Sequence, residues 1–161
     1  MKIDLKQLCE FLVKAKKAGY ASGDKINKIK EKNKSKTITF KDGDWIYNDN
    51  YFGGEPYGGR EVVFFKNQPV FIMVYYGLVY EKVNNFKEVY KFLQEAITLI
   101  PTDKPFRGPK KYKRDDYLYE NKFIGKLTNF SGKEIVTLKG KKIYEAKYMG
   151  GLVDQRKEKN G

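Results

Sequence analysis

The residues best suited to binding chemistry gather in residues 45–59, where aromatic side chains alternate with glycines. Flat rings with polar tips line pockets or stack on bases, and paired glycines let a ligand approach the backbone. Phe106-Arg107-Gly108-Pro109 is a second such segment, because an Arg held in a Gly/Pro turn clamps carboxylates or phosphates. The predicted ligand-binding residues are Trp45, Tyr47, Tyr51, Gly53, Gly54, Glu61 and Arg107.

Both segments also have a structural interpretation, which stays open. Residues 45–59 are equally compatible with a glycine-rich loop that closes a twisted sheet over an aromatic core. Arg107 is equally suited to pairing with Glu61 or Glu134, and both acids are predicted to begin strands. We interpret Glu134 as structural and leave the role of Glu61 undecided.

Catalysis is the less favoured function, because the chain has no histidine and one cysteine, Cys9. Ser-His-Asp and Cys-His mechanisms are therefore excluded within this chain, as are zinc sites built on His or several Cys. Carboxylates remain: Asp44, Asp49 and Glu61 are close in sequence, and paired carboxylates suffice for glycoside hydrolysis. We expect no catalytic residue, no metal and no cofactor, with a carboxylate-dependent enzyme as an alternative.

Lysine dominates the charge: 29 Lys and 4 Arg stand against 20 acids, giving a formal charge of +13. Positive charge attracts phosphates, but base recognition and bidentate clamps favour Arg, which is scarce. A solvated lysine surface is the first interpretation and nucleic-acid backbone binding by basic loops 24–36 and 104–114 the second. Both loops follow predicted helices, so we expect them on one side of the domain. The candidate contacts are Lys28, Lys30, Lys32, Lys110, Lys111, Lys113 and Arg114.

The sequence repeats itself in an ordered series of matches. Asp44-Trp45-Ile46-Tyr47 matches Asp116-Tyr117-Leu118-Tyr119, and Tyr75-Tyr76-Gly77 matches Tyr148-Met149-Gly150 after a gap of one residue. We therefore predict a single α+β domain, 1–161, made of two α-β-β-β repeats (about 3–79 and 84–153) with a short basic C-terminal tail. The repeats should form a largely antiparallel sheet with two helices on one face.

Apolar spacing predicts two helices, with capping-box-like starts at Asp4 and Asn85 and with ends near Gly19 and Pro101. Strands are predicted at 45–52, 61–65, 70–79, 116–123, 134–138 and 142–148, with a further one at 37–40. Alternation places one set of apolar side chains inward, under the helices. The opposite face is apolar in the first repeat, so a dimer contact through it is a second interpretation beside a curved sheet that buries both faces. Its residues are Val62, Phe64, Ile72 and Val74.

Taken together, Asp-Trp-x-Tyr…Tyr-Phe-Gly-Gly (44–54), Tyr-Tyr-Gly (75–77) and Phe-Arg-Gly-Pro (106–109) resemble an uncharacterised prokaryotic domain family. Its members look like stand-alone proteins or modules behind helix-turn-helix regulator domains, which implies a sensory or interaction role. The resemblance implies no activity. Phe71 stands where the family has Trp, and Met149 stands where it has His.

The expected function is a non-catalytic binding or regulatory module for an unknown small molecule or protein. No leader or membrane-spanning segment is visible, so we expect a cytoplasmic location and no membrane partner.

Overall fold

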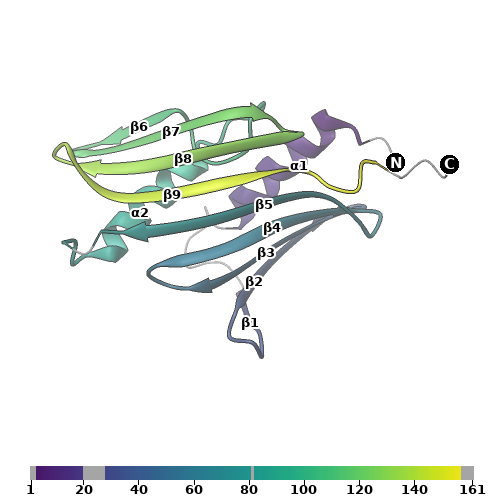
Figure 1. Ribbon diagram of the computed structural model, residues 1–161, viewed down its shortest axis with the longest axis horizontal. Helices are drawn as coiled ribbons and strands as arrows, with labels where there is room; N and C mark the ends of the chain where they lie inside the picture. Colours follow the sequence, from purple (N-terminus) through teal and green to yellow (C-terminus); the bar gives the residue numbers. More distant parts are fainter. Residues whose placement is uncertain (1–2, 20–27, 81, 157–161) are drawn as a thin grey trace.

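The computed structural model describes residues 3–19, 28–80 and 82–156. Within these residues one antiparallel sheet of nine strands has the order β1-β2-β3-β4-β5-β9-β8-β7-β6. Two helices lie behind it in Figure 1, so they cover one face and leave the other open. The predicted α+β class with an antiparallel sheet and two helices is therefore confirmed. Neither described helix is long and apolar enough to cross a membrane.

Both helices begin at the predicted capping residues. Helix α1 (Leu5–Ala18) follows Asp4, whose carboxylate accepts hydrogen bonds from the backbone N–H of Lys6 and of Gln7, and it ends at Gly19. Helix α2 (Phe86–Thr98) follows Asn85, which accepts one from the Glu88 N–H. Such caps satisfy backbone donors that the first turn leaves unpaired.

The strands run longer than their predicted ranges. Their bounds are β1 (Ile29–Lys30), β2 (Lys36–Asp42), β3 (Trp45–Gly53), β4 (Tyr57–Phe65), β5 (Gln68–Val79), β6 (Lys111–Arg114), β7 (Tyr117–Lys126), β8 (Asn129–Leu138) and β9 (Lys141–Leu152). The prediction missed β1 and β6, which are short, lysine-containing edge strands without an apolar pattern.

Glu61 and Glu134 were predicted to begin strands, and this is wrong. Each lies in the middle of its strand, with glycines before it that continue the sheet. Gly59 pairs with Tyr51, and a Cβ on Gly59 would lie 2.6 Å from the Tyr51 Cβ. The glycine is therefore required by a close approach inside the sheet, where its type alone indicated a loop.

The inward face has the predicted parity. Val63, Phe71 and Met73 are buried under α1, and Val136 and Tyr144 are buried under α2. Strands β5 and β9 pair at the centre of the sheet, so the two helix-covered halves share one continuous layer.

Candidate functional site

A pocket of about 230 Å³ lies between the inner face of the sheet and α2. We call it the inner pocket. Four tyrosines line it together with buried charged groups and the β3–β4 turn. Its lining residues are Lys28, Lys36, Asp49, Tyr51, Gly53, Gly54, Tyr57, Glu61, Tyr75, Tyr90, Gln94 and Arg107.

The predicted ligand-binding residues divide into two groups. Five of them line the inner pocket, namely Tyr51, Gly53, Gly54, Glu61 and Arg107. Trp45 instead packs between Phe11 and Phe65, with ring centroids 5.4 and 4.4 Å away. Tyr47 is buried in the core and lines no part of the pocket. These two rings therefore belong to the structural interpretation of residues 45–59.

The β3–β4 turn is fastened over the pocket by one acid. The Glu55 carboxylate accepts a hydrogen bond of 2.7 Å from the Val79 N–H and another from the Tyr90 hydroxyl. Gly53 turns the chain at a φ of +81°, where a Cβ would lie 2.4 Å from the Pro56 carbonyl oxygen. The turn is thus tied to both β5 and α2.

The Phe-Arg-Gly-Pro segment is buried and held by three hydrogen bonds from distant elements. Lys16 Nζ donates to the Phe106 carbonyl at 2.6 Å, and Asn121 Nδ2 donates to the Gly108 carbonyl at 3.1 Å. The Gly108 N–H donates to the Tyr119 hydroxyl at 3.1 Å. These bonds fix the backbone on both sides of Arg107.

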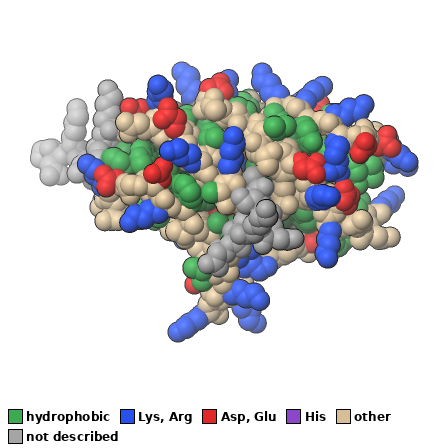
Figure 2. All heavy atoms as spheres, turned by 180° about the vertical axis from the view of Figure 1, so that it is seen from behind, with side chains coloured by type: hydrophobic (Ala, Val, Ile, Leu, Met, Phe, Trp, Pro, Cys, Tyr) green, Lys and Arg blue, Asp and Glu red, His purple; other side chains and the backbone are tan. Residues whose placement is uncertain are grey.

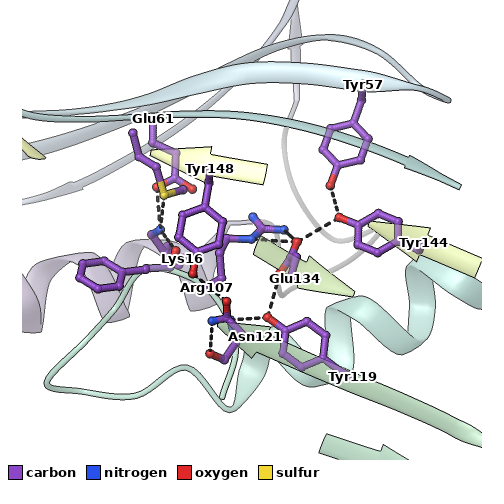
Figure 3. Close-up of polar contacts among 12 residues, drawn as sticks. Lys16, Tyr57, Glu61, Arg107, Tyr119, Asn121, Glu134, Tyr144 and Tyr148 are labelled. Carbon is purple, nitrogen blue, oxygen red and sulfur yellow. Dashed lines mark hydrogen bonds and ion pairs between the residues drawn. The ribbon is translucent and has the colours of Figure 1, made fainter. Parts of the chain in front are cut away.

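Arg107 pairs with Glu134, one of the two partners that the sequence allowed. Figure 3 shows its guanidinium directed at the Glu134 carboxylate, with Nη2 2.5 Å and Nε 3.1 Å from Oε1. Tyr119 and Tyr144 also donate to that carboxylate, and Tyr144 bonds to the Tyr57 hydroxyl at the pocket wall. Burial lowers the pKa of Arg107, but Glu134, together with the nearby Tyr57 and Tyr144, outweighs this and raises the pKa well above its ordinary value. The structural interpretation of Glu134 fits this network.

Glu61 pairs with Lys16 of α1, which is not among the predicted binding residues. Their Nζ and Oε2 atoms are 2.7 Å apart, and both side chains are only 4% exposed. Burial lowers the pKa of Lys16, while Glu61 opposes that change. A lysine on the apolar face of a helix was the available signal, since a buried lysine needs a carboxylate.

Asp49 gives the pocket its unusual electrostatics. It lies directly opposite Glu61 in the β3–β4 register, is 5% exposed, and accepts a hydrogen bond from the Tyr75 hydroxyl. Loss of hydration, followed by repulsion from Glu61, raises the pKa of Asp49 to about 7. Asp49 is therefore far easier to protonate than an ordinary aspartate.

The other half of the sheet provides an internal comparison. Asn121 lies opposite Glu134 in the β7–β8 register, as Asp49 lies opposite Glu61. The neutral amide of Asn121 bonds to the Gly108 carbonyl and accepts from the Tyr148 hydroxyl. A neutral amide opposite a buried glutamate is thus compatible with the packing of the sheet. Packing alone therefore does not explain why Asp49, opposite Glu61, is a carboxyl.

The candidate nucleic-acid residues are not brought together. Lys28, Lys30 and Lys32 lie in or beside β1, whereas Lys110, Lys111, Lys113 and Arg114 lie in or beside β6, as the strand bounds show. Strands β1 and β6 are opposite edges of the described sheet, so the expectation that the two clusters share one side is wrong. Residues 24–27 of the first cluster, and tail residues 157–161, lie outside the described residues.

Two details weigh further on the basic clusters. Arg114 has a structural role, since it pairs with Glu88 at 2.6 Å and Glu95 at 2.5 Å. Figure 2 shows the helix side of the molecule, where basic side chains are interspersed with acidic ones. A further group of basic side chains lies on the projecting hairpin of β1 and β2. That distribution is typical of a solvated surface.

The candidate dimer residues lie on the open face. Val62 pairs with Ile72 across β4 and β5, and both are half-buried, as is Phe64, whereas Val74 is exposed. A dimer through them stays a prediction.

Comparison with known proteins adds a family and no function. No curated protein matches the chain, and no solved structure matches it. The family model described as Domain of unknown function (DUF5680) matches residues 49–153, from Asp49 in β3 through the end of the sheet. The chain therefore belongs to this family of uncharacterised domains.

Proposed function

We propose that this chain is a non-catalytic binding module whose inner pocket takes a small molecule with a positively charged amine directed at Asp49. The observation that carries the proposal is a buried carboxyl, opposite a second one, in the wall of a pocket. A regulatory role in the cytoplasm, of the kind that the family resemblance implies, is the setting in which we expect such a module to act.

The first support is the balance of buried charge. Over the described residues, three buried acids (Asp49, Glu61, Glu134) stand against two buried bases (Lys16, Arg107). Glu61 and Glu134 each pair with one base, so Asp49 is the acid in excess. A buried charge is stable only when it is paired or neutralised. An ammonium group would supply the third cation.

The second support is the aromatic lining. The Tyr57 ring centroid is 6.0 Å from that of Tyr75 and 5.9 Å from that of Tyr90. Tyrosine faces attract ammonium groups through the negative face of the ring. A pocket of about 230 Å³ is slightly smaller than typical drug-sized sites and suits a metabolite.

The test is a thermal-shift screen of small primary and quaternary amines, matched with neutral isosteres. An amine at about 100 times its dissociation constant stabilises the native state by about 2.7 kcal/mol, or roughly 5–10 °C in Tm. Asp49→Asn should remove that shift, whereas Asp44→Asn, at an exposed site, should retain it. Equal shifts with the neutral isosteres would exclude an amine ligand.

Binding should also release a proton, which gives an independent measurement. The pKa of Asp49 is raised to about 7, so the carboxyl holds a proton over much of the pH range below neutrality, and a cation favours the ionised form. Calorimetry with a quaternary amine, which has no proton of its own to exchange, in buffers of different ionisation enthalpy should therefore report a fraction of a proton released at pH 7 and nearly none at pH 9. A value of zero at both pH values would remove Asp49 from the binding site.

A carboxylate-dependent enzyme is the second candidate, because Asp49 and Glu61 both line the pocket. A pKa of about 7 suits a general acid or base at neutral pH. Mass spectrometry of each stabilising compound after incubation with the protein distinguishes the candidates. A new product that disappears in Asp49→Asn supports catalysis, and unchanged compounds support binding alone.

We also propose that the halves 3–79 and 84–153 arose by duplication of one helix-and-strand unit. The mirrored strand order about β5 and β9 supports it, as do the equivalent pairs Asp49–Glu61 and Asn121–Glu134.

A further inference from the structure

Three lysines form a row across the open face of the sheet. Lys122 pairs directly with Lys133, and Lys133 pairs directly with Lys147, across β7, β8 and β9. We call these three residues the lysine row. Paired residues project from the same side of a sheet, and buried Tyr148, next to Lys147, projects toward the helices, so the row projects away from them. Strands β9, β8 and β7 face the viewer in Figure 1.

Such a row destabilises the strand pairs that contain it, because like charges directly opposite one another repel. Glu145 relieves Lys133 alone, at 3.0 Å, and that carboxylate is shared with Lys142 at 2.7 Å. Lys122 and Lys147 have no ion pair with any carboxylate in the described parts of the chain. The positive charges of Lys122 and Lys147, at the two ends of the row, are therefore available to a partner.

Apolar and aromatic side chains lie alongside the row. Tyr76 is opposite Lys147 and is 55% exposed. The next line across the sheet joins Val74, Met149, Ser131 and Ile124 by direct pairing, and Met149 and Ile124 are among the most exposed apolar residues described. These side chains and the lysine row line one shallow hollow of about 660 Å³.

The basic track continues to the edge of the sheet. Lys122 also lines a second hollow with Lys104 and Lys110, where Lys111 of β6 is paired with Glu120 at 3.5 Å. From Tyr76 to Lys122 the row crosses three strand spacings, or about 14 Å. Lys104 and Lys110 therefore extend the positive charge of the row toward the β6 edge of the sheet.

We propose that the open face of the sheet binds a single strand of nucleic acid, with phosphates along the lysine row and bases against Tyr76, Met149 and Ile124. A basic track beside exposed rings and apolar side chains is how proteins hold single strands without reading sequence. A duplex would place its stacked bases out of reach of Tyr76. A membrane-binding surface would place lysines around a protruding apolar tip, whereas here the lysine row lies beside a flat apolar strip.

The experiment is fluorescence anisotropy with labelled dT20 and U20 at 50 and 200 mM salt. The test variant is Lys122→Gln/Lys147→Gln, and the matched control is Lys6→Gln/Lys87→Gln on the helices, which removes the same charge from exposed residues. Each lost phosphate contact reduces the salt slope by about 0.7 for single strands. The affinity loss of the test variant between 50 and 200 mM salt should then be about sevenfold smaller than that of the wild type. Its affinity at 50 mM should be at least tenfold weaker.

Further measurements separate the alternatives. Tyr76→Ala should weaken binding severalfold and leave the salt slope unchanged, because a stacking contact releases no counterions. Equal losses of affinity in the test and control variants would show that binding depends only on the net charge of the protein, and they would overturn the proposal. So would tighter binding to a 20-base-pair duplex, or binding to phosphatidylserine vesicles with none to dT20 and U20. Loss of amine binding in Asp49→Asn with dT20 affinity intact would show that the two sites are independent.

Discussion

Arg107→Met should lower the free energy of unfolding by about 3–5 kcal/mol, because it leaves the buried Glu134 carboxylate without its cation. Glu134 has no exposed surface, so water cannot replace the guanidinium. The melting temperature should fall by roughly 10 °C or more for a domain of this size. Urea unfolding followed by circular dichroism measures the loss.

Two further variants test the cause. Arg60→Met removes an exposed arginine from the same sheet and should change stability by less than about 0.5 kcal/mol. Arg107→Met/Glu134→Gln removes both charges and keeps an oxygen that accepts from Tyr119 or Tyr144, so it should be more stable than the sum of the two single losses predicts. Additive losses would contradict the assignment of this pair as the origin of the effect.

The second large effect is a pH dependence that Asp49→Asn should abolish. The pKa of Asp49 is about 7 in the native state, and an unfolded Asp titrates near its ordinary value of 3.8. Between these values the native state holds a proton that the unfolded state has lost, so the free energy of unfolding falls as pH rises. The fall is about 1.4 kcal/mol per pH unit and sums to at most about 4 kcal/mol.

The Asp49→Asn variant should therefore match the wild type at pH 4 and exceed it by up to about 4 kcal/mol at pH 8. The measurement is urea unfolding at pH 4.5, 6, 7 and 8. Asp44→Asn, at an exposed position, should follow the wild-type curve. If wild type and Asp49→Asn ran parallel from pH 4.5 to 8, the raised pKa would be wrong. A gain in stability that accompanies loss of amine binding is the signature of a site whose charge serves a ligand.

Part of the site was predictable from local pattern. Tyr51, Gly53, Gly54, Glu61 and Arg107 were selected by residue type, and all of them line the inner pocket. Trp45 and Tyr47 have the same type and strand face, but they lie toward the other end of β3, away from the turn, where side chains pack against the core. Residue type alone does not distinguish the end of β3 that lines the pocket from the end that packs in the core.

Asp49 shows what one further comparison would have provided. Its sequence context alone indicates only a candidate acid for catalysis, yet the sequence matches between the two halves align it with Asn121. A carboxyl in one half of the sheet and an amide in the other mark the position as one where charge is not required by the fold. Lys16 had a weaker signal, a charged residue on the buried side of α1.

The sequence alone determined the features that depend on neighbouring residues. The helix caps at Asp4 and Asn85, the α+β class and the inward parity of the strands all follow from short-range spacing, because capping and alternation act within a few residues. Tertiary structure decided the rest. The meeting of Lys16 with Glu61, the protonation of Asp49, the separation of the basic clusters to opposite edges and the lysine row all depend on strand order, strand register and burial. Those are set by packing between segments far apart in the chain, so residue types along the sequence do not specify them.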